Sequence, residues 1–239
     1  MIFMKVAVVG LTRKLIENKL SGYGLKLDKK NPDVVISFGG DGTALYAERV
    51  YPGIPRILIK HSKTCNKCEE HDFSKIFTRL KEKRYKIVEE IKVEGIVNKD
   101  PKKRLIGLNE IGIHHKIPTK AIRLMVKVNG KTIENNLIGD GLLVATPYGS
   151  TGYFYSICRK KFSKGLGIAF NNSVNVRRKS VIVKDDSVIE VKVLRGKGIM
   201  TADENDRMIL LEGGDKITIR KSKGKARIIE LDKKRIIKV

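Results

Sequence analysis

A change of pattern near residue 87 constrains the fold of this chain more than any other feature. Before Ile87, short apolar runs alternate with helical patterns; after it, apolar runs are short, β-branched and bounded by turn residues. Strands that alternate with helices favour a parallel sheet covered by helices, whereas strands in succession favour antiparallel sheets. We therefore predict an α/β N-terminal domain over residues 1–87, built on a small parallel sheet, and an all-β, sandwich-like C-terminal domain over residues 88–225. Residues 226–239 are expected to pair back onto either domain.

The N-terminal pattern supplies three strands and three helices. Strands are expected at Lys5–Gly10, Asp33–Phe38 and Arg56–Lys60. Helices are expected at Thr12–Leu20, with Thr12 as its cap, at Gly42–Val50, and from Asp72 or Ser74 to Lys83. Ligands of such sheets bind beyond the carboxyl ends of the strands, so those ends are where a site is expected.

The C-terminal pattern is that of a strand-rich domain. Asn129-Gly130 predicts a two-residue hairpin turn, because both residues tolerate a positive φ. Leu105–His114 is expected to form one strand, with His114-His115 in an exposed turn at its end, and Thr151–Arg159 is expected to form a helix. Further strands are expected at Val88–Val97, Ile122–Val128, Thr132–Asn136, Leu142–Thr146, Val181–Lys184, Val188–Leu194, Ile199–Ala202, Met208–Leu211 and Lys216–Lys221.

The charge of the chain invites two interpretations. Its 239 residues include 50 Lys and Arg against 26 Asp and Glu, a net charge of +24, yet 41% are hydrophobic, enough for a packed core. The basic residues are spread along the chain and Gln is absent, which favours the solvated surface of a thermophilic protein over a nucleic-acid footprint. No apolar run approaches the ~18 residues of a membrane span, and the N-terminus resembles a first strand rather than a signal peptide. We expect a cytoplasmic protein without a membrane partner.

A glycine-rich loop, Phe38-Gly39-Gly40-Asp41-Gly42-Thr43, follows a buried strand and opens a helix. Glycines let bare N–H groups approach a phosphate, and a helix N-terminus favours negative charge. An acidic residue in such a loop suits chemistry: Asp41 would take a proton from an attacking hydroxyl or help to hold a divalent ion. The alternative is a simple strand–helix turn with Asp41 as the helix cap.

Two further motifs lie in the second domain. From Asp140 to Ser156, an apolar strand ends in Thr146-Pro147, a Gly-Ser-Thr turn follows, and Ser150 or Thr151 is expected to cap the next helix with its hydroxyl facing outward. Tyr153 would be available to stack on a flat ring. The second motif is Asn109-Glu110, a polar pair inside an apolar strand pattern, which is either buried with partners that bind a ligand or simply lies on an exposed sheet face.

Together these motifs resemble those of the NAD kinase family, in its archaeal form. The family's Gly-Gly-Asp-Gly-Thr loop is matched at Gly39–Thr43, its Asn-Glu pair at Asn109-Glu110, and its Asp-Gly strand with the following turn from Asp140 to Tyr153. The loop alone is shared with the diacylglycerol, sphingosine and 6-phosphofructo-kinases of the same superfamily.

The resemblance implies transfer of a phosphoryl group from ATP, or from polyphosphate, to the 2′-hydroxyl of the adenosine ribose of NAD. Asp41 would be the catalytic proton acceptor, and Mg²⁺ would bridge oxygens of the donor. It also implies a homodimer or homotetramer. A related kinase of a lipid or sugar hydroxyl, and a non-catalytic nucleotide- or RNA-binding protein, are the alternatives. Phosphate-binding residues would be Gly39, Gly40 and Thr43, and NAD-binding residues Gly42, Asn109, Glu110, Asp140, Thr151, Gly152, Tyr153 and Ser156.

The segment after the third strand carries a separate signal. His61, Cys65, Cys68 and His71 lie within one short loop and offer two thiols and two imidazoles, enough for a tetrahedral Zn²⁺ site. A redox-sensitive dithiol or disulfide, or coincidence in an exposed loop, are the alternatives.

Overall fold

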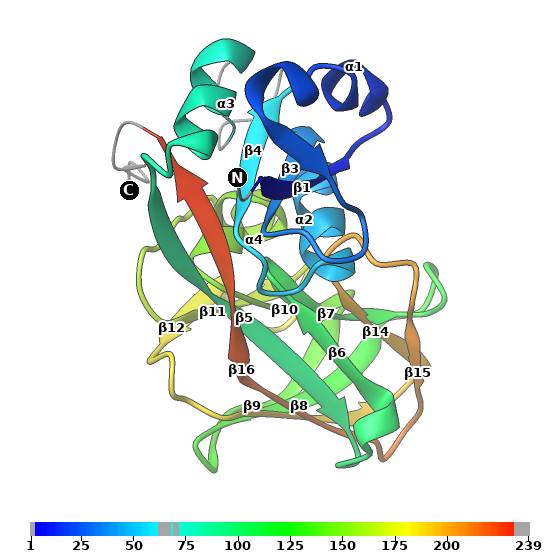
Figure 1. Ribbon diagram of the computed structural model, residues 1–239. Helices are drawn as coiled ribbons and strands as arrows, with labels where there is room; N and C mark the ends of the chain where they lie inside the picture. The colour runs from blue at the N-terminus through cyan, green and yellow to red at the C-terminus, as the bar shows by residue number, and fades with distance from the viewer. Residues whose placement is uncertain (1–2, 62–67, 69–71, 232–239) are drawn as a thin grey trace. The chain divides into compact units, whose positions relative to one another are not determined.

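The computed structural model describes residues 3–61, 68 and 72–231, which form two compact units (Figure 1). Within the described residues, the first unit comprises residues 3–90 and 225–231, and the second comprises residues 91–224. The chain passes from one unit to the other within strand β5 (Lys86–Val97) and again within strand β16 (Lys216–Glu230).

The first unit is a parallel sheet with helices on both faces. Its strand order is β2-β1-β3-β4, and β16 pairs in parallel with β4 through Ile228 and Arg56. Apolar side chains of α1 and α3 join the core on one face of this sheet, whereas Ala47 of α2 packs against Ala7 and Val35 on the other. The elements are β1 (Met4–Val9), α1 (Lys14–Glu17), β2 (Leu25–Leu27), β3 (Val34–Gly39), α2 (Asp41–Val50), β4 (Arg56–Lys60) and α3 (Phe73–Lys81).

Local capping explains one correct and one wrong helix prediction in this unit. Asp72 caps α3, because its side chain accepts a hydrogen bond of 3.0 Å from the backbone N–H of Lys75. The predicted helix Thr12–Leu20 is wrong in extent: α1 is a single turn, and Arg13 stands at its N-cap without a side-chain hydrogen bond. Ile16 is the only buried residue of α1, so little apolar contact is available to extend it.

The second unit is a sandwich of two antiparallel sheets. One sheet has the order β16-β13-β8-β9, with β5 and β6 attached to it, and the other has the order β12-β11-β10-β7-β14-β15. One buried apolar cluster draws side chains from both sheets. These two units confirm the predicted fold class. The strands are β6 (Arg104–Gly107), β7 (Glu110–His115), β8 (Ile122–Val128), β9 (Lys131–Gly139), β10 (Gly141–Ala145), β11 (Leu166–Asn171), β12 (Ser180–Val183), β13 (Ile189–Arg195), β14 (Gly198–Ala202) and β15 (Ile209–Leu211).

Helix α4 (Tyr153–Cys158) covers the outer face of the second sheet. Phe154 and Cys158 of this helix pack against Leu143 of β10 and Ala169 of β11. The predicted hairpin turn is confirmed, since β8 and β9 pair in antiparallel fashion around Asn129 and Gly130, with φ of 49° and 78°.

Two elements of the second unit differ from the sequence prediction. Strand β11 was missed, because its residues from Leu166 to Phe170 are buried on both faces and so lack the polar alternation of a surface strand. The expected strand Lys216–Lys221 is longer than predicted, since β16 continues to Glu230 and takes in the first residues of the segment that was expected to pair back onto either domain. Among the described residues, no helix is long and apolar enough to cross a membrane.

Candidate active site

The glycine loop lies at the carboxyl end of β3 in the first unit. Gly40 is the N-cap residue of α2, and Asp41 is the first residue of the helix, so the alternative of Asp41 as the cap is wrong. The cap makes no side-chain hydrogen bond, which leaves the helix N-terminus as a site for an anion. Asp41 is exposed at this end of the helix. A Cβ on Gly39 would lie 2.2 Å from the hydroxyl oxygen of Thr43, so any larger residue here would force Thr43 to move.

The carboxyl ends of three neighbouring strands meet at this loop. Gly10 follows β1 with a φ of +139°, and a Cβ there would lie 2.1 Å from the carbonyl oxygen of Phe38. The backbone N–H of His61, just after β4, donates to the carbonyl oxygen of Gly39 at 3.0 Å. Gly10 was not predicted as part of the site, although a glycine directly after a buried strand was the signal for it. A close backbone approach here gives a ligand access to main-chain groups.

The predicted metal or disulfide loop lies partly outside the described residues, because Cys65 and His71 belong to the segments that the structure does not describe. Of its two described members, His61 packs its ring against Phe38 with centroids 4.4 Å apart, and the Cys68 sulfur lies 3.9 Å from the Gly39 carbonyl oxygen. Within the described part of the chain, no group of three or more His, Cys, Asp or Glu side chains could hold a metal ion.

In the second unit, the predicted strand Leu105–His114 is interrupted where Asn109 precedes Glu110, and β6 and β7 are separate strands. The cause is Asp203, which follows β14. Its Oδ2 accepts a hydrogen bond from the N–H of Leu108 at 2.7 Å, and its Oδ1 accepts from Asn109 at 2.8 Å and from Glu110 at 3.1 Å. These N–H groups bind a carboxylate instead of a neighbouring strand, so the ladder breaks here and the Asn-Glu pair is held in a fixed turn.

A buried threonine supports the same turn from the other side. The hydroxyl of Thr146 donates to the carbonyl of Leu108 at 2.6 Å and accepts from the N–H of Gly149 at 3.1 Å. A Cβ on Gly149 would lie 2.3 Å from the carbonyl oxygen of Asn109, so the two backbones touch. The structure thus brings the Asn109 turn and the Thr146 turn into contact. The side-chain oxygen of Asn109, Oδ1, is buried and has no hydrogen-bond partner among the described residues.

Asp140 lies at the far end of the same pair of strands. Its Oδ2 accepts from the side-chain amide of Asn172 at 2.7 Å, and its Oδ1 lies 3.4 Å from Nδ1 of His115. The backbone N–H of His115 also donates to the Asp140 carbonyl at 2.9 Å. Asp140 is therefore fixed by two neighbours before any ligand binds.

Tyr153 connects this end of the sheet to helix α4. Its ring stacks on that of His114 with centroids 5.8 Å apart and an interplanar angle of 12°, and its hydroxyl accepts from the side-chain amide of Asn171 at 3.1 Å. The assignment of His114 to an exposed turn is wrong, since both histidines lie half-buried in β7. Burial, and secondly the charge of His115, hold the pKa of His114 below its ordinary value of 6.5, against the opposing effect of Asp140. His114 is thus an uncharged aromatic partner at neutral pH.

The turn before α4 departs from the prediction. Ser150 is fully buried and donates to the carbonyl of Phe162 at 3.1 Å, and Gly152 rather than Ser150 or Thr151 stands at the helix N-cap. A Cβ on Gly152 would lie 3.8 Å from the side-chain nitrogen of Asn109, so this glycine borders the Asn-Glu turn. The Ser156 hydroxyl donates to the Tyr153 carbonyl at 2.7 Å. Ser150 was taken for an outward-facing hydroxyl because sequence alone does not show that the 3-10 turn (Tyr148–Thr151) is buried.

Comparisons with known proteins agree with this geometry. The family model of the ATP-NAD kinase C-terminal domain matches residues 108–231. An NAD kinase from Sulfurisphaera tokodaii is 30% identical over 227 residues, covering 90% of this chain and 88% of the relative. The crystal structure of an NAD kinase from Archaeoglobus fulgidus in complex with ATP has a TM-score of 0.79 at 22% identity, over 96% of this chain and 94% of that one. Yeast NADH kinase complexed with NADH has a TM-score of 0.82 at 15% identity, over 95% and 83%.

The chain is a phosphotransferase: its glycine loop lies at the end of a strand, and its relatives by sequence and by structure are NAD kinases. The matches give no support to a kinase of lipids or sugars or to a non-catalytic binding protein. The chain belongs to the NAD kinase family.

Proposed function

We propose that this chain transfers the γ-phosphoryl group of ATP to the 2′-hydroxyl of the adenosine ribose of NAD. In this reaction the hydroxyl oxygen forms a bond to the γ-phosphorus, the bond between that phosphorus and the β–γ bridging oxygen breaks, and the products are NADP and ADP. Transfer of this kind needs chiefly positioning and neutralisation of charge. Membership of the NAD kinase family supports this reaction.

Asp41 acts as the base in this proposal. It is exposed at the N-terminus of α2, beside Gly39 and Gly40, whose backbone is open to a phosphate. A carboxylate beside a phosphate-binding loop would repel the ligand unless it had a task of its own, and that task is to take the proton from the 2′-hydroxyl as the new bond forms. Gly39, Gly40 and Thr43 hold phosphate oxygens, and Gly42 borders the substrate.

Asn109 is the observation that carries the NAD-binding part of the proposal. Its buried side-chain oxygen lacks a partner among the described residues, and a buried acceptor left unsatisfied costs about 1–3 kcal/mol. A donor on NAD, either a ribose hydroxyl or the adenine amino group, removes that cost when it binds. Asn109 is held by Asp203 and by contact with Gly149, so its side chain needs little reordering.

The remaining NAD contacts surround this turn and the end of α4. Glu110 and Asp140 accept hydrogen bonds from hydroxyl or amino groups of NAD. Tyr153 offers the face of its ring, already stacked on His114 from the other side, to the flat adenine. Thr151 and Gly152 lie beside the adenosine of NAD in this proposal, and the Ser156 hydroxyl ties the first turn of α4 together by donating to the Tyr153 carbonyl.

A divalent ion fits this site only as part of the donor complex. The described residues contain no group of three metal-binding side chains. Mg²⁺ is typically held by one or two carboxylates together with substrate phosphates and water. Asp41 is the carboxylate of the glycine loop that would hold it, and a bound Mg²⁺ would neutralise charge on the phosphate oxygens.

The test is an Asp41→Asn variant, with Glu82→Gln as a control that removes one exposed carboxylate from the same unit. Formation of NADP from NAD, ATP and Mg²⁺ is expected to fall about 10²- to 10⁴-fold in the Asp41 variant, because it loses its general base. Its unfolding transition should match that of the wild type. Normal turnover by the Asp41→Asn variant would refute the assignment of the base.

The same assay defines the substrates. ATP and polyphosphate are offered as donors, and NAD and NADH as acceptors, at high temperature. We also propose a cytoplasmic homodimer or homotetramer, as the family resemblance implies. Light scattering of the eluted protein measures its mass, and a monomer at assay concentration would contradict this part of the proposal.

A further inference from the structure

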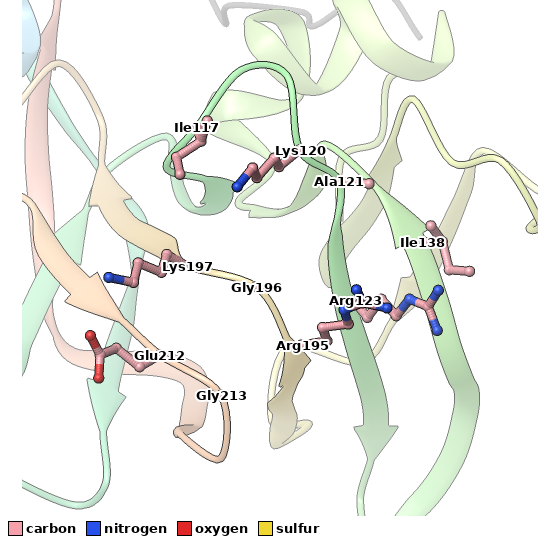
Figure 2. Close-up of a pocket in the computed structure, with 10 residues that line it drawn as sticks. All are labelled: Ile117, Lys120, Ala121, Arg123, Ile138, Arg195, Gly196, Lys197, Glu212 and Gly213. Atoms are coloured by element: carbon pink, nitrogen blue, oxygen red, sulfur yellow. The ribbon is translucent and has the colours of Figure 1, made fainter.

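A basic cavity of about 1000 Å³ lies in the second unit, and none of its lining residues belongs to the nucleotide site described above. Figure 2 shows Arg123 and Arg195 close together on one wall, and Lys197 with Glu212 on the opposite wall. Lys120 projects from the loop above them. Four cationic side chains thus share one cavity with a single carboxylate.

The two arginines are held together by the sheet itself. Arg195 of β13 lies directly across from Arg123 of β8, after a register shift between Val193 and Arg195. Like charges directly opposite one another destabilise an antiparallel pair, and bulges often re-aim side chains beside binding sites. Further along the same two strands the paired residues are Glu190 and Lys127, which carry opposite charges. The repulsion is therefore local to the cavity.

The loop after β13 brings a third cation to the same place. Gly196 has a φ of +100° and turns the chain from β13 in one sheet to β14 in the other. The loop is anchored by the N–H of Lys116, which donates to the carbonyl of Lys197 at 2.9 Å. Arg195 and Lys197 consequently both line the cavity, from either side of one glycine.

Among the described residues, these cations have no carboxylate partner within ion-pair distance. In the described part of the chain, none of the four forms an ion pair, whereas Arg104 and Arg220 share Glu94 and Arg178 binds Glu134. A planar guanidinium binds two phosphate oxygens at once, and a lysine ammonium adds a point charge. The cavity is at the upper end of the ~300–1000 Å³ range of small-molecule sites, larger than one phosphate group requires.

We propose that this cavity binds a small polyanion made of linked phosphate groups, at a site separate from that of NAD. Arg123 and Arg195 hold one phosphate between them, and Lys120 and Lys197 hold the next. The bound phosphate neutralises the repulsion between the Arg123 and Arg195 guanidinium groups, which face each other across the paired strands β8 and β13.

The experiment is a calorimetric titration of the full chain with inorganic triphosphate at fixed ionic strength, with and without saturating NAD. One molecule per chain is expected to bind, and NAD should not displace it. The double variant R123Q/R195Q is expected to bind at least ten times more weakly. The double variant K131Q/K179Q removes the same charge from exposed positions outside the cavity and is expected to bind as the wild type does.

The control readouts separate this proposal from its rivals. R123Q/R195Q should keep ATP-dependent NAD phosphorylation within about twofold of the wild type and should melt no earlier, because it relieves a like-charge pair. The proposal is overturned by equal weakening in both double variants, which would reflect net charge alone, or by displacement of triphosphate by NAD. It is overturned as well if citrate binds as tightly as triphosphate, or if a short single-stranded RNA competes and binds more tightly through the same arginines.

Discussion

Asp203 is the residue on which the geometry of the Asn109-Glu110 turn depends most directly. Its carboxylate accepts from three successive backbone N–H groups, and its own N–H donates to the carbonyl of Glu110 at 3.2 Å. Asp203 also adopts a left-handed conformation with a φ of 48°, which Asp, Asn and Gly tolerate better than other residues. Replacement by Asn therefore keeps the backbone and the shape and changes only the hydrogen bonding.

The expected loss can be worked out bond by bond. Hydrogen bonds to a charged acceptor contribute about 1.5–3 kcal/mol each, and neutral ones about 0.5–1.5 kcal/mol. An Asn whose oxygen replaces Oδ1 keeps the bonds to Asn109 and Glu110 in neutral form. Its NH₂ group then faces the N–H of Leu108, where two donors meet. One charged bond is lost and two become neutral, so we expect Asp203→Asn to lower the free energy of unfolding by about 3.5–6 kcal/mol.

A short series of variants resolves the contributions. Asp203→Gly loses all three side-chain bonds but relieves the backbone by about 1 kcal/mol, so a loss of about 4–8 kcal/mol is expected. Asp203→Ala should lose about 1 kcal/mol more, because alanine is strained at the positive φ of this position. Asp206→Asn, in the same loop and exposed, is the charge-matched control. Guanidinium titrations give the stabilities. For Asp203→Asn, kcat/KM for NAD is expected to fall about tenfold or more, because Asn109 shifts. Equal stability of the Asp203→Asn and Asp206→Asn proteins, or an unchanged kcat/KM, would refute this account of the turn.

Two other predictions concern the residues around this turn. Thr146→Val leaves the Leu108 carbonyl and the Gly149 N–H buried without the hydroxyl that binds both, so unfolding titrations should show a loss of about 2–3 kcal/mol in the free energy of unfolding. Thr146→Ser keeps the hydroxyl and should lose only about 1 kcal/mol. Equal losses in the two variants would contradict the role of the hydroxyl. Burial lowers the pKa of His114 in the folded protein, so the unfolded state takes up a proton first as the pH falls through 6.5. The contribution of His114 to the free energy of unfolding is therefore complete above that pH and is lost below it. His114→Phe keeps an aromatic ring against Tyr153 but cannot titrate. The difference in the free energy of unfolding between wild type and variant should therefore shift in favour of the variant as the pH falls from about 7 to about 5. A difference that does not change with pH would show that His114 is not the titrating group.

Much of the candidate site followed from the sequence because it depends on local chemistry. A buried strand that ends in glycines and opens a helix places Asp41 at a helix N-terminus through bonds between near neighbours. Asp72 as a cap and Asn129-Gly130 as a turn were equally local, since each depends on side-chain or backbone preferences within a few residues. The division into an α/β part and a β-rich part followed from periodicity for the same reason.

Tertiary structure alone decided which distant residues meet. The break between Leu108 and Glu110 is caused by a carboxylate more than ninety positions away, and no local pattern announces such a partner. The burial of Ser150, the stacking of His114 on Tyr153 and the pairing of Arg123 with Arg195 likewise arise when segments that are separate in the chain come into contact. Conformational preferences depend on residues that are adjacent in the chain, so the sequence shows them directly. Sheet registers and buried hydrogen bonds between distant residues form only when the chain folds, so the sequence pattern does not show them.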